Sequence, residues 1–327
     1  MLLTYIVSHA DNDKTVYSVL RRELRISATM LRRLKKADAI VVSGKSVFTN
    51  YKLSAGEVVE VDISAAEPLC DNLPEDGKVD VLFENDGLLA VNKPSGILVH
   101  PSRARHTGTL SNFVAGYLQD KRAVYLSGHF KTDEPAHGID PSCHAVNRLD
   151  RDTSGVVLFA KNSYMKSLAS DALSSPDTKK EYLALTFGEM PERGVIDAPI
   201  IRFEERNMLR IVSPEGQRAV TYFETLGIIG AGERSFSLVK LRLETGRTHQ
   251  IRVHCLHIGH PILGDRLYSS DQSSALSRDL GVETQALHAQ TLAFSEPLTG
   301  QRIEIRAPWS SKNYACILPQ DMLAYLS

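Results

Sequence analysis

Residues 79–327 hold more apolar runs of strand length than segments in which apolar residues recur at helical spacing. Helical spacing is found at residues 109–118, 165–173 and 250–257. The strand runs do not alternate with helices at the regular spacing of βαβ units, so the pattern predicts an α+β fold with a large mixed, mainly antiparallel sheet. The predicted strands are VDVLFEN, GLLAVNKPSGILVH, GVVLFAK, KEYLALTFGEM, SFSLVKLRLETG and QRIEIRAP.

The start of the chain predicts a separate small α/β domain. Apolar residues recur at helical spacing over residues 15–24, and a second helix is predicted from Ser27 through Leu34. The segments AIVVSGKSV and KLSAGEVVEVDI then predict strands that are joined by turns. The stretch SAAEPLCDNLPEDGK carries two prolines and four acidic residues with little apolar periodicity. We therefore expect a small domain at residues 1–65, a linker at 66–78 and a larger domain at 79–327.

The charge of the chain is balanced overall but uneven along its length. There are 38 Lys and Arg against 39 Asp and Glu, a net charge of −1, so bulk charge predicts no polyanionic partner. Between Lys14 and Lys36, however, 8 basic residues face a single acidic one, Glu23. Taken alone, such a run indicates a solvated helical face. Its members on the two predicted helices are Arg21, Arg22, Arg25, Arg32, Arg33, Lys35 and Lys36.

Cysteine usage and the N-terminal segment bear on the cellular compartment. Cys70, Cys143, Cys255 and Cys316 lie far apart and form no CxxC pair, so neither a zinc ribbon nor a disulfide framework is indicated. The start MLLTYIVSHADND has no positive region before its apolar run, unlike a signal peptide. No apolar run reaches the roughly 18 residues of a membrane span. We expect a cytoplasmic protein without membrane association.

A charged corner, NRLDRDTSG, stands directly before the predicted inner strand GVVLFA. A carboxylate next to apolar surface needs a partner, because desolvating an ion is costly. Asp150 and Asp152 could form a carboxylate pair for acid and base chemistry. Arg148 could be a structural ion-pair partner or could contact a substrate phosphate. The residues of the corner alone leave these alternatives open.

The segment LETGRTHQIRVHCLHIGHPILGD gathers two arginines and four histidines. His254 and His257 would share a helix face, but His260 lies past the helix end and no acidic ligand falls within the cluster, which argues against a metal site. Arg247 and Arg252 near a helix start repel the helix dipole, so they imply a nearby anion. That anion is Asp150, a phosphate or both.

Five ordered blocks make the chain resemble the RluA/RluD family of RNA pseudouridine synthases. The first 65 residues are similar to the small RNA-binding domain, named after a ribosomal protein, that many members carry. The resemblance implies the pseudouridine synthase catalytic fold, and it favours an RNA-facing role for the N-terminal basic run. The blocks are VLFENDGLLAVNKPSGILVHPS, NRLDRDTSGVVLFAKN, KKEYLALTFGEM, LETGRTHQIRVHCLHIGHPILGDRLY and LHAQTLAFSEPLTG.

The resemblance also implies roles for individual residues. Asp150 corresponds to the catalytic aspartate, Arg252 to its basic partner and Tyr182 to the aromatic residue that stacks on the target uracil. The alternative for Tyr182 is a strand tyrosine that packs in the core. Arg148 resembles the arginine that enters the RNA where the target base was withdrawn, and Arg247 is a further candidate RNA contact. No cofactor or metal is implied.

We therefore expect an RNA pseudouridine synthase, a monomer, that isomerises specific uridines in structured ribosomal RNA or transfer RNA after base flipping. Asp150 either attacks the anomeric carbon or removes a ribose proton. The alternative is a catalytically inactive RNA-binding or ribosome-assembly factor of the same fold; a nucleoside hydrolase would not account for the basic domain. One position departs from the family pattern: Asn147 stands where the family has histidine.

Overall fold

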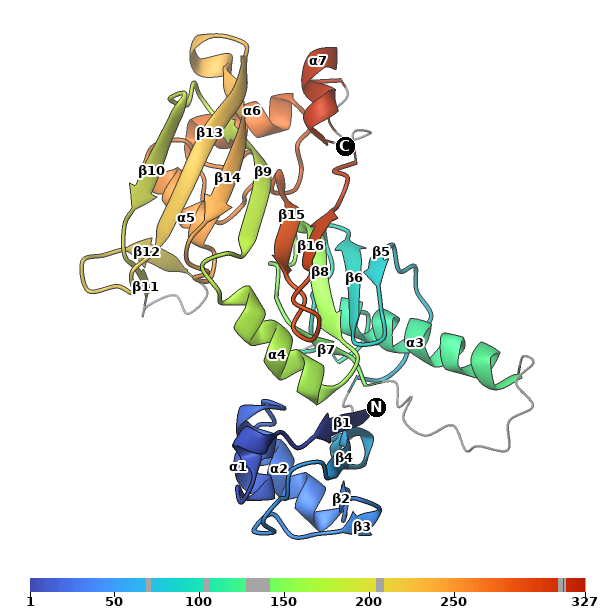
Figure 1. Ribbon diagram of the computed structural model, residues 1–327. Coiled ribbons are helices and arrows are strands. Elements are labelled where there is room, and N and C mark those ends of the chain that lie inside the picture. The colour runs from blue at the N-terminus through green and yellow to red at the C-terminus, as the bar shows by residue number, and fades with distance from the viewer. Residues whose placement is uncertain are drawn as a thin grey trace.

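The computed structural model describes residues 1–68, 72–102, 106–127, 142–203, 209–310, 314 and 316–326. The N-terminal part is a four-stranded antiparallel sheet with two helices packed against it (Figure 1). Both helices begin where the sequence places a capping hydroxyl, Thr15 and Ser27. The elements are β1 (Leu2–Ile6), α1 (Val16–Arg22), α2 (Ala28–Lys36), β2 (Ile40–Val42), β3 (Lys45–Ser46) and β4 (Val58–Asp62), with strand order β1-β4-β2-β3.

All but two of the other strands form one ten-stranded sheet over the described residues, in the order β10-β13-β14-β9-β15-β8-β6-β5, with β16 on β15 and β7 on β8. All neighbours are antiparallel except β15 and β8, which confirms the predicted α+β fold with a mixed, mainly antiparallel sheet. The strands are β5 (Val81–Glu84), β6 (Leu88–Lys93), β7 (His144–Ala145), β8 (Ser154–Ala160), β9 (Lys179–Phe187), β10 (Arg193–Asp197), β13 (Val220–Ile229), β14 (Phe236–Leu243), β15 (Leu287–Ser295) and β16 (Arg302–Arg306), and β11 (Ile200–Arg202) and β12 (Arg210–Val212) form a separate hairpin.

Helices cover both faces of the sheet, which explains why β8 is apolar throughout. Alternate residues of β6 and β8 enter two different cores, one beneath α3 and one beneath α4. A third core lies between β9, β14 and the helices α5 and α6. The helices are α3 (Leu110–Ser127), α4 (Ser163–Leu173), α5 (Gln250–His257), α6 (Asp271–Asp279) and α7 (Gln320–Leu323). None of the helices in the described parts of the chain has the length and apolar character that crossing a membrane requires.

The parallel contact between β8 and β15 requires glycine at its start. Gly155 has φ +113°, and a Cβ there would collide with the backbone of Ala289 on β15. This close approach places the N-terminal end of β8 beside β15 and β9. The charged corner that precedes β8 is therefore held at the centre of the sheet.

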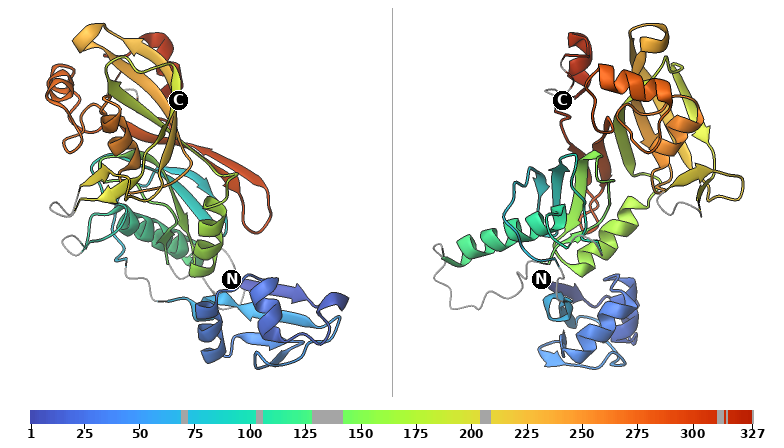
Figure 2. Two further views of the ribbon diagram at one scale, coloured as in Figure 1. Left: turned by 90° about the vertical axis from the view of Figure 1, so that its left-hand side faces the viewer. Right: turned by 180° about the vertical axis from the view of Figure 1, so that it is seen from behind.

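The N-terminal part packs against the end of α4, at one end of the molecule in all three views (Figures 1 and 2). The Tyr164 hydroxyl donates to the Leu24 carbonyl at 2.8 Å, and Arg25 lies 3.4 Å from Asp171. The Glu67 carboxylate accepts hydrogen bonds from the Ser163 backbone and contacts His144 at 2.7 Å. Glu67 belongs to the stretch expected to be a linker, and Cys70 in the same stretch lies outside the described residues.

Several predicted boundaries were wrong. The strand expected over residues 87–100 ends at Lys93, because Pro94 lacks the N–H that a continuing ladder needs. The helix expected over 109–118 extends to Ser127. Helix α6 was not predicted, since its short polar sequence has few apolar residues and is defined mainly by the capping box of Ser270.

Candidate active site

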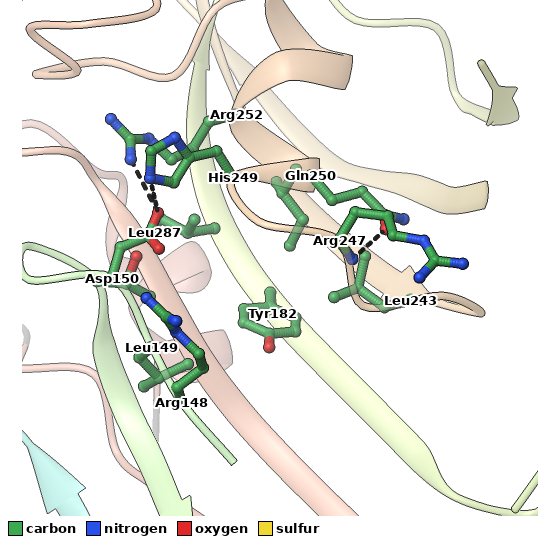
Figure 3. Close-up of a pocket in the computed structure, with 12 residues that line it drawn as sticks. Arg148, Leu149, Asp150, Tyr182, Leu243, Arg247, His249, Gln250, Arg252 and Leu287 are labelled. Atoms are coloured by element: carbon green, nitrogen blue, oxygen red, sulfur yellow. Dashed lines mark hydrogen bonds and ion pairs between the residues drawn. The ribbon is translucent and has the colours of Figure 1, made fainter. Parts of the chain in front are cut away.

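A hollow of about 80 Å³ lies where the corner before β8 meets β9 and the N-terminal turn of α5 (Figure 3). Of the residues singled out in the sequence, the structure brings together five that are far apart along the chain. The basic residues on or next to α1 and α2, and Asp152, His254, His257 and His260, do not line this pocket. The five are Arg148, Asp150, Tyr182, Arg247 and Arg252.

Asp150 and Arg252 form an ion pair at the inner end of the pocket. The Arg252 Nη1 donates to Asp150 Oδ2 at 2.8 Å, although the two residues are 102 positions apart. Arg252 is almost fully buried, whereas the Asp150 side chain keeps 21% of its surface exposed. Asp150 thus presents a carboxylate to the pocket while its charge is compensated from behind.

Asp265, which was not singled out in the sequence, anchors the other side of the Arg252 guanidinium. Arg252 Nε and Nη2 donate to its two carboxylate oxygens at 2.6 and 2.9 Å. The Asp265 side chain is fully buried and also accepts the backbone N–H of Leu267 and Tyr268. Burial alone would lower the pKa of Arg252, but the bonds and charge of Asp265, with the charge of Asp150, raise it above the ordinary value.

His249 is one of the four histidines of the segment LETGRTHQIRVHCLHIGHPILGD, and its place at the pocket was not predicted. It occupies the left-handed region at φ 59° directly before α5, a costly conformation for a non-glycine residue. Its Nδ1 lies 2.8 Å from the Tyr268 hydroxyl, and its Nε2 lies 3.7 Å from Asp150 Oδ2. The Tyr268 hydroxyl also accepts the Arg210 N–H at 2.8 Å, so Tyr268 links the β12 strand to the His249 ring. Burial lowers the pKa of His249, although the charge of Asp150 opposes this shift.

Tyr182 projects from β9 into the pocket, with its ring between Asp150 and Leu243 (Figure 3). Burial of the hydroxyl, with the nearby charge of Asp150, raises the pKa of Tyr182 to about 12. The phenol therefore stays protonated at neutral pH and offers the pocket a ring face. Its ring also contacts two of the apolar cores. Tyr182 therefore both packs against the core and lines the pocket.

Two arginines stand at the mouth of the pocket. Arg148 is exposed and makes no hydrogen bond or ion pair within the described part of the chain. The Arg247 Nε donates to the Arg218 carbonyl at 3.1 Å, and the rest of its guanidinium is exposed (Figure 3). Asp152 does not line the pocket and is bonded to Arg151 at 3.1 Å. The structure therefore does not bring Asp150 and Asp152 together as a carboxylate pair.

The other candidates have separate surroundings. His254 lies between Thr221 and the Ala198 carbonyl, each at 2.9 Å, and His260 bonds the Phe187 carbonyl. No group of three potential metal ligands occurs among the residues that the structure describes. Of the N-terminal basic residues, Arg21 bonds the Ile26 carbonyl and Arg22 pairs with Glu23, whereas Arg33, Lys35 and Lys36 are exposed on α2.

Comparisons with known proteins identify the family of the chain. A sequence model of the RNA pseudouridylate synthase family matches residues 87–257, which include Asp150, Tyr182 and Arg252. The uncharacterized RNA pseudouridine synthase YhcT of Bacillus subtilis is 36% identical over 94% of this chain and 93% of its own length. The chain belongs to the RNA pseudouridine synthase family.

A further relative supports the family, and a solved structure supports the fold. The ribosomal large subunit pseudouridine synthase D of Xanthomonas campestris is 34% identical over 90% of this chain and 82% of its own length. The solved structure of human RNA pseudouridylate synthase domain containing 1 superposes with a TM-score of 0.54 at 23% identity, over 79% of this chain and 96% of that one. As a pseudouridine synthase, the chain is an isomerase that acts on RNA.

In this pseudouridine synthase, buried Lys93 fixes the corner that carries Asp150. Lys93 is 0% exposed, and its ammonium donates to the carbonyls of Pro94, Ile97 and Arg151 at 2.9, 2.8 and 2.7 Å. Arg151 directly follows Asp150, so the lysine ties the end of β6 to the pocket. Burial lowers the pKa of Lys93 to about 7, although the charges of Asp152 and Asp150 oppose this shift.

The lowered pKa of Lys93 predicts a pH-dependent stability. Between about pH 7 and the ordinary value of 10.5, the unfolded chain holds a proton that the folded chain does not. The free energy of unfolding should therefore rise with pH across this window in the wild type. Lys93→Met should lack that rise, measured by urea unfolding at several pH values. Parallel pH profiles of the two proteins would contradict the assigned titration.

Proposed function

We propose that the protein isomerises specific uridines in structured RNA, with Asp150 as the catalytic carboxylate. The observation that carries the proposal is the carboxylate of Asp150, which accepts a hydrogen bond from Arg252 and faces a pocket that also contains the ring of Tyr182. The carboxylate is accessible enough to touch a substrate, yet its charge is compensated on the protein side.

The reaction breaks the bond between C1′ of the ribose and N1 of uracil and forms a bond between C1′ and C5. The C5 proton is lost and N1 gains one, so no redox change occurs. Asp150 either attacks C1′ or takes a ribose proton, and both routes use the carboxylate that Arg252 contacts at 2.8 Å. Tyr182 would stack on the uracil while the base turns, since its aromatic ring offers a flat apolar face.

The size of the pocket supports base flipping. A hollow of about 80 Å³ cannot admit a duplex, so the uridine must leave its stack before the glycosidic bond reaches Asp150. Arg148 stands at the mouth without a protein partner in the described chain, and its planar guanidinium could fill the vacated position and bind phosphate. Arg247 would contact the backbone on the other side of the mouth.

The target is proposed to be ribosomal RNA or transfer RNA, modified by a cytoplasmic monomer. The name of the Xanthomonas relative refers to the large ribosomal subunit, which favours ribosomal RNA as the first substrate to test. Pseudouridines should be mapped across ribosomal and transfer RNA with and without the gene. Purified protein should then form pseudouridine, in the unmodified RNA, at each position where the map without the gene lacks it. Identical maps, with no conversion by purified protein, would contradict the proposed function.

Substitutions of Tyr182 separate the ring from its hydroxyl. Tyr182→Phe keeps the ring face and should retain RNA binding and most turnover, because the protonated hydroxyl is not needed as a base. Tyr182→Leu removes the aromatic face and should lower turnover by about tenfold or more, since stacking a base on an aromatic ring contributes roughly 1–3 kcal/mol. Single-turnover rates at saturating RNA measure both effects. Equal losses in the two variants would assign the role to the hydroxyl.

The basic run on α2 predicts a salt-dependent contribution to RNA binding. Replacing Arg33, Lys35 and Lys36 together with glutamine removes three exposed charges without touching a core residue. If each meets a phosphate, the slope of log affinity against log salt should become shallower by about 2–3, because each contact releases counterions. Binding of ribosomal RNA over a salt series measures the slope. An unchanged slope would show that these residues do not contact RNA and form a solvated helical face.

A further inference from the structure

A second hollow, of about 300 Å³, opens beside the catalytic pocket and shares Arg148, Tyr182 and Leu243 with it. Its walls come from β8, β9 and β15 and from the C-terminal half of α4, which contributes Ser170. The residues that line it include two cations, Arg148 and Lys180, and no carboxylate. The hollow is therefore positive and continuous with the place where the target uridine would sit.

Lys180 is the less expected of these cations. It lies two positions before Tyr182 on β9, so both side chains leave the same face of the strand, roughly 7 Å apart along it. Lys180 is half-buried, and burial lowers its pKa. Within the described part of the chain its ammonium has no hydrogen bond or ion pair. Holding an unpaired cation out of water costs free energy, which an anionic ligand would recover.

A buried hydroxyl in the same hollow is also without a partner. Thr291 on β15 is 3% exposed, and its hydroxyl makes no hydrogen bond within the described residues. It follows an irregularity in the pairing of β15 with β9, between Ala289 and Thr291, which sets its position on the strand. A buried hydroxyl without a hydrogen-bond partner destabilises a protein core, but it can form a hydrogen bond with a ligand that enters the hollow.

We propose that this second hollow binds the nucleotide adjacent to the target uridine, with Lys180 and Arg148 on its phosphodiester and Thr291 on its ribose or base. The separation of Lys180 from Tyr182 along β9 is on the order of one nucleotide of an extended strand. The assignment rests on the proposed function in one respect, since the adjacent nucleotide is defined by a uridine next to Asp150. With this site, the enzyme would contact RNA on both sides of Tyr182: the target uridine in the catalytic pocket and the adjacent nucleotide in the second hollow.

Binding of a short single-stranded oligouridylate over a potassium chloride series tests the proposal without requiring turnover. Lys180→Met should weaken affinity by roughly tenfold at low salt, and the log–log slope should become shallower by about 0.7 for the lost phosphate contact. Lys180→Arg should restore both. Lys166→Met is the matched control, because Lys166 is exposed on α4 and does not line the hollow. Thr291→Val should also weaken binding.

Melting temperatures distinguish a ligand site from a structural role. Lys180→Met removes an unpaired, half-buried charge, so its melting temperature should be unchanged or raised. Thr291→Val removes a buried hydroxyl without a partner in the described chain, so its melting temperature should also be unchanged or raised. A lowered melting temperature with unchanged affinity would overturn the proposal, as would an unchanged salt slope or a wild-type chain that does not bind oligouridylate. Conversion of ribosomal RNA by the wild type is measured separately, so failure of the isomerase assignment and failure of this site give different results.

Discussion

Asp150→Asn should lower pseudouridine formation by at least about a thousandfold, which corresponds to about 4 kcal/mol of activation free energy. The amide keeps the shape of the carboxylate but is neither a nucleophile nor a base. Both routes proposed for Asp150 require its negative charge. The measurement is release of tritium from RNA labelled at C5 of uridine, because every completed isomerisation removes that hydrogen.

The same variant should remain folded. Arg252 keeps its two hydrogen bonds to Asp265, so the guanidinium stays in place when Asp150 is neutral. Asp152→Asn is the matched control, since Asp152 is paired with Arg151 outside the pocket and its loss should leave turnover within about twofold, as for ordinary surface substitutions. Near wild-type turnover of Asp150→Asn would exclude Asp150 as the catalytic group.

Sequence patterns predicted the central strands because burial there is uniform. The run GVVLFA is β8, whose alternate residues enter two cores, and residues 250–257 form α5 as predicted. Patterns failed where an element depends on its neighbours. Lys93 lies in the middle of the strand predicted over residues 87–100, yet the strand ends there and its ammonium is buried against three carbonyls that only the fold brings together.

The ion pair at the pocket was predictable only in part. The resemblance placed Asp150 beside Arg252, although nothing in the spacing of 102 residues indicates a contact. Asp265 was missed because its link to Arg252 depends on the path of the chain after α5. Its position in the sequence, directly after the buried Ile262-Leu263-Gly264 run, is a weak signal that a buried carboxylate follows.

Asn147 illustrates a departure that the fold explains. Its side-chain amide donates to the Val156 carbonyl at 3.2 Å and accepts the Leu158 N–H at 2.7 Å. The residue therefore ties the segment before Arg148 to the backbone of β8. It lines the second hollow and not the catalytic pocket, so its replacement of histidine bears on the adjacent nucleotide more than on the chemistry of Asp150.

Arg252→Met should destabilise the protein as well as inactivate it. The substitution leaves Asp265 fully buried without its cation and deprives Asp150 of its partner, and breaking a buried ion pair in this way costs about 3–5 kcal/mol. The free energy of unfolding in urea measures the loss. Arg252→Lys should rescue little of it, because an ammonium cannot bond Asp265 through two nitrogens and also reach Asp150.

A double-mutant cycle then isolates the buried pair. Asp265→Asn in the Arg252→Met background removes the orphaned charge, so the double variant should be more stable than Arg252→Met alone. It should remain inactive, because Asp150 still lacks its partner in the pocket. Strictly additive losses in the cycle would show that Arg252 and Asp265 are not coupled. Recovered stability without recovered turnover would separate the two roles of Arg252: it pairs with buried Asp265 inside the fold, and it holds the Asp150 carboxylate at the pocket surface.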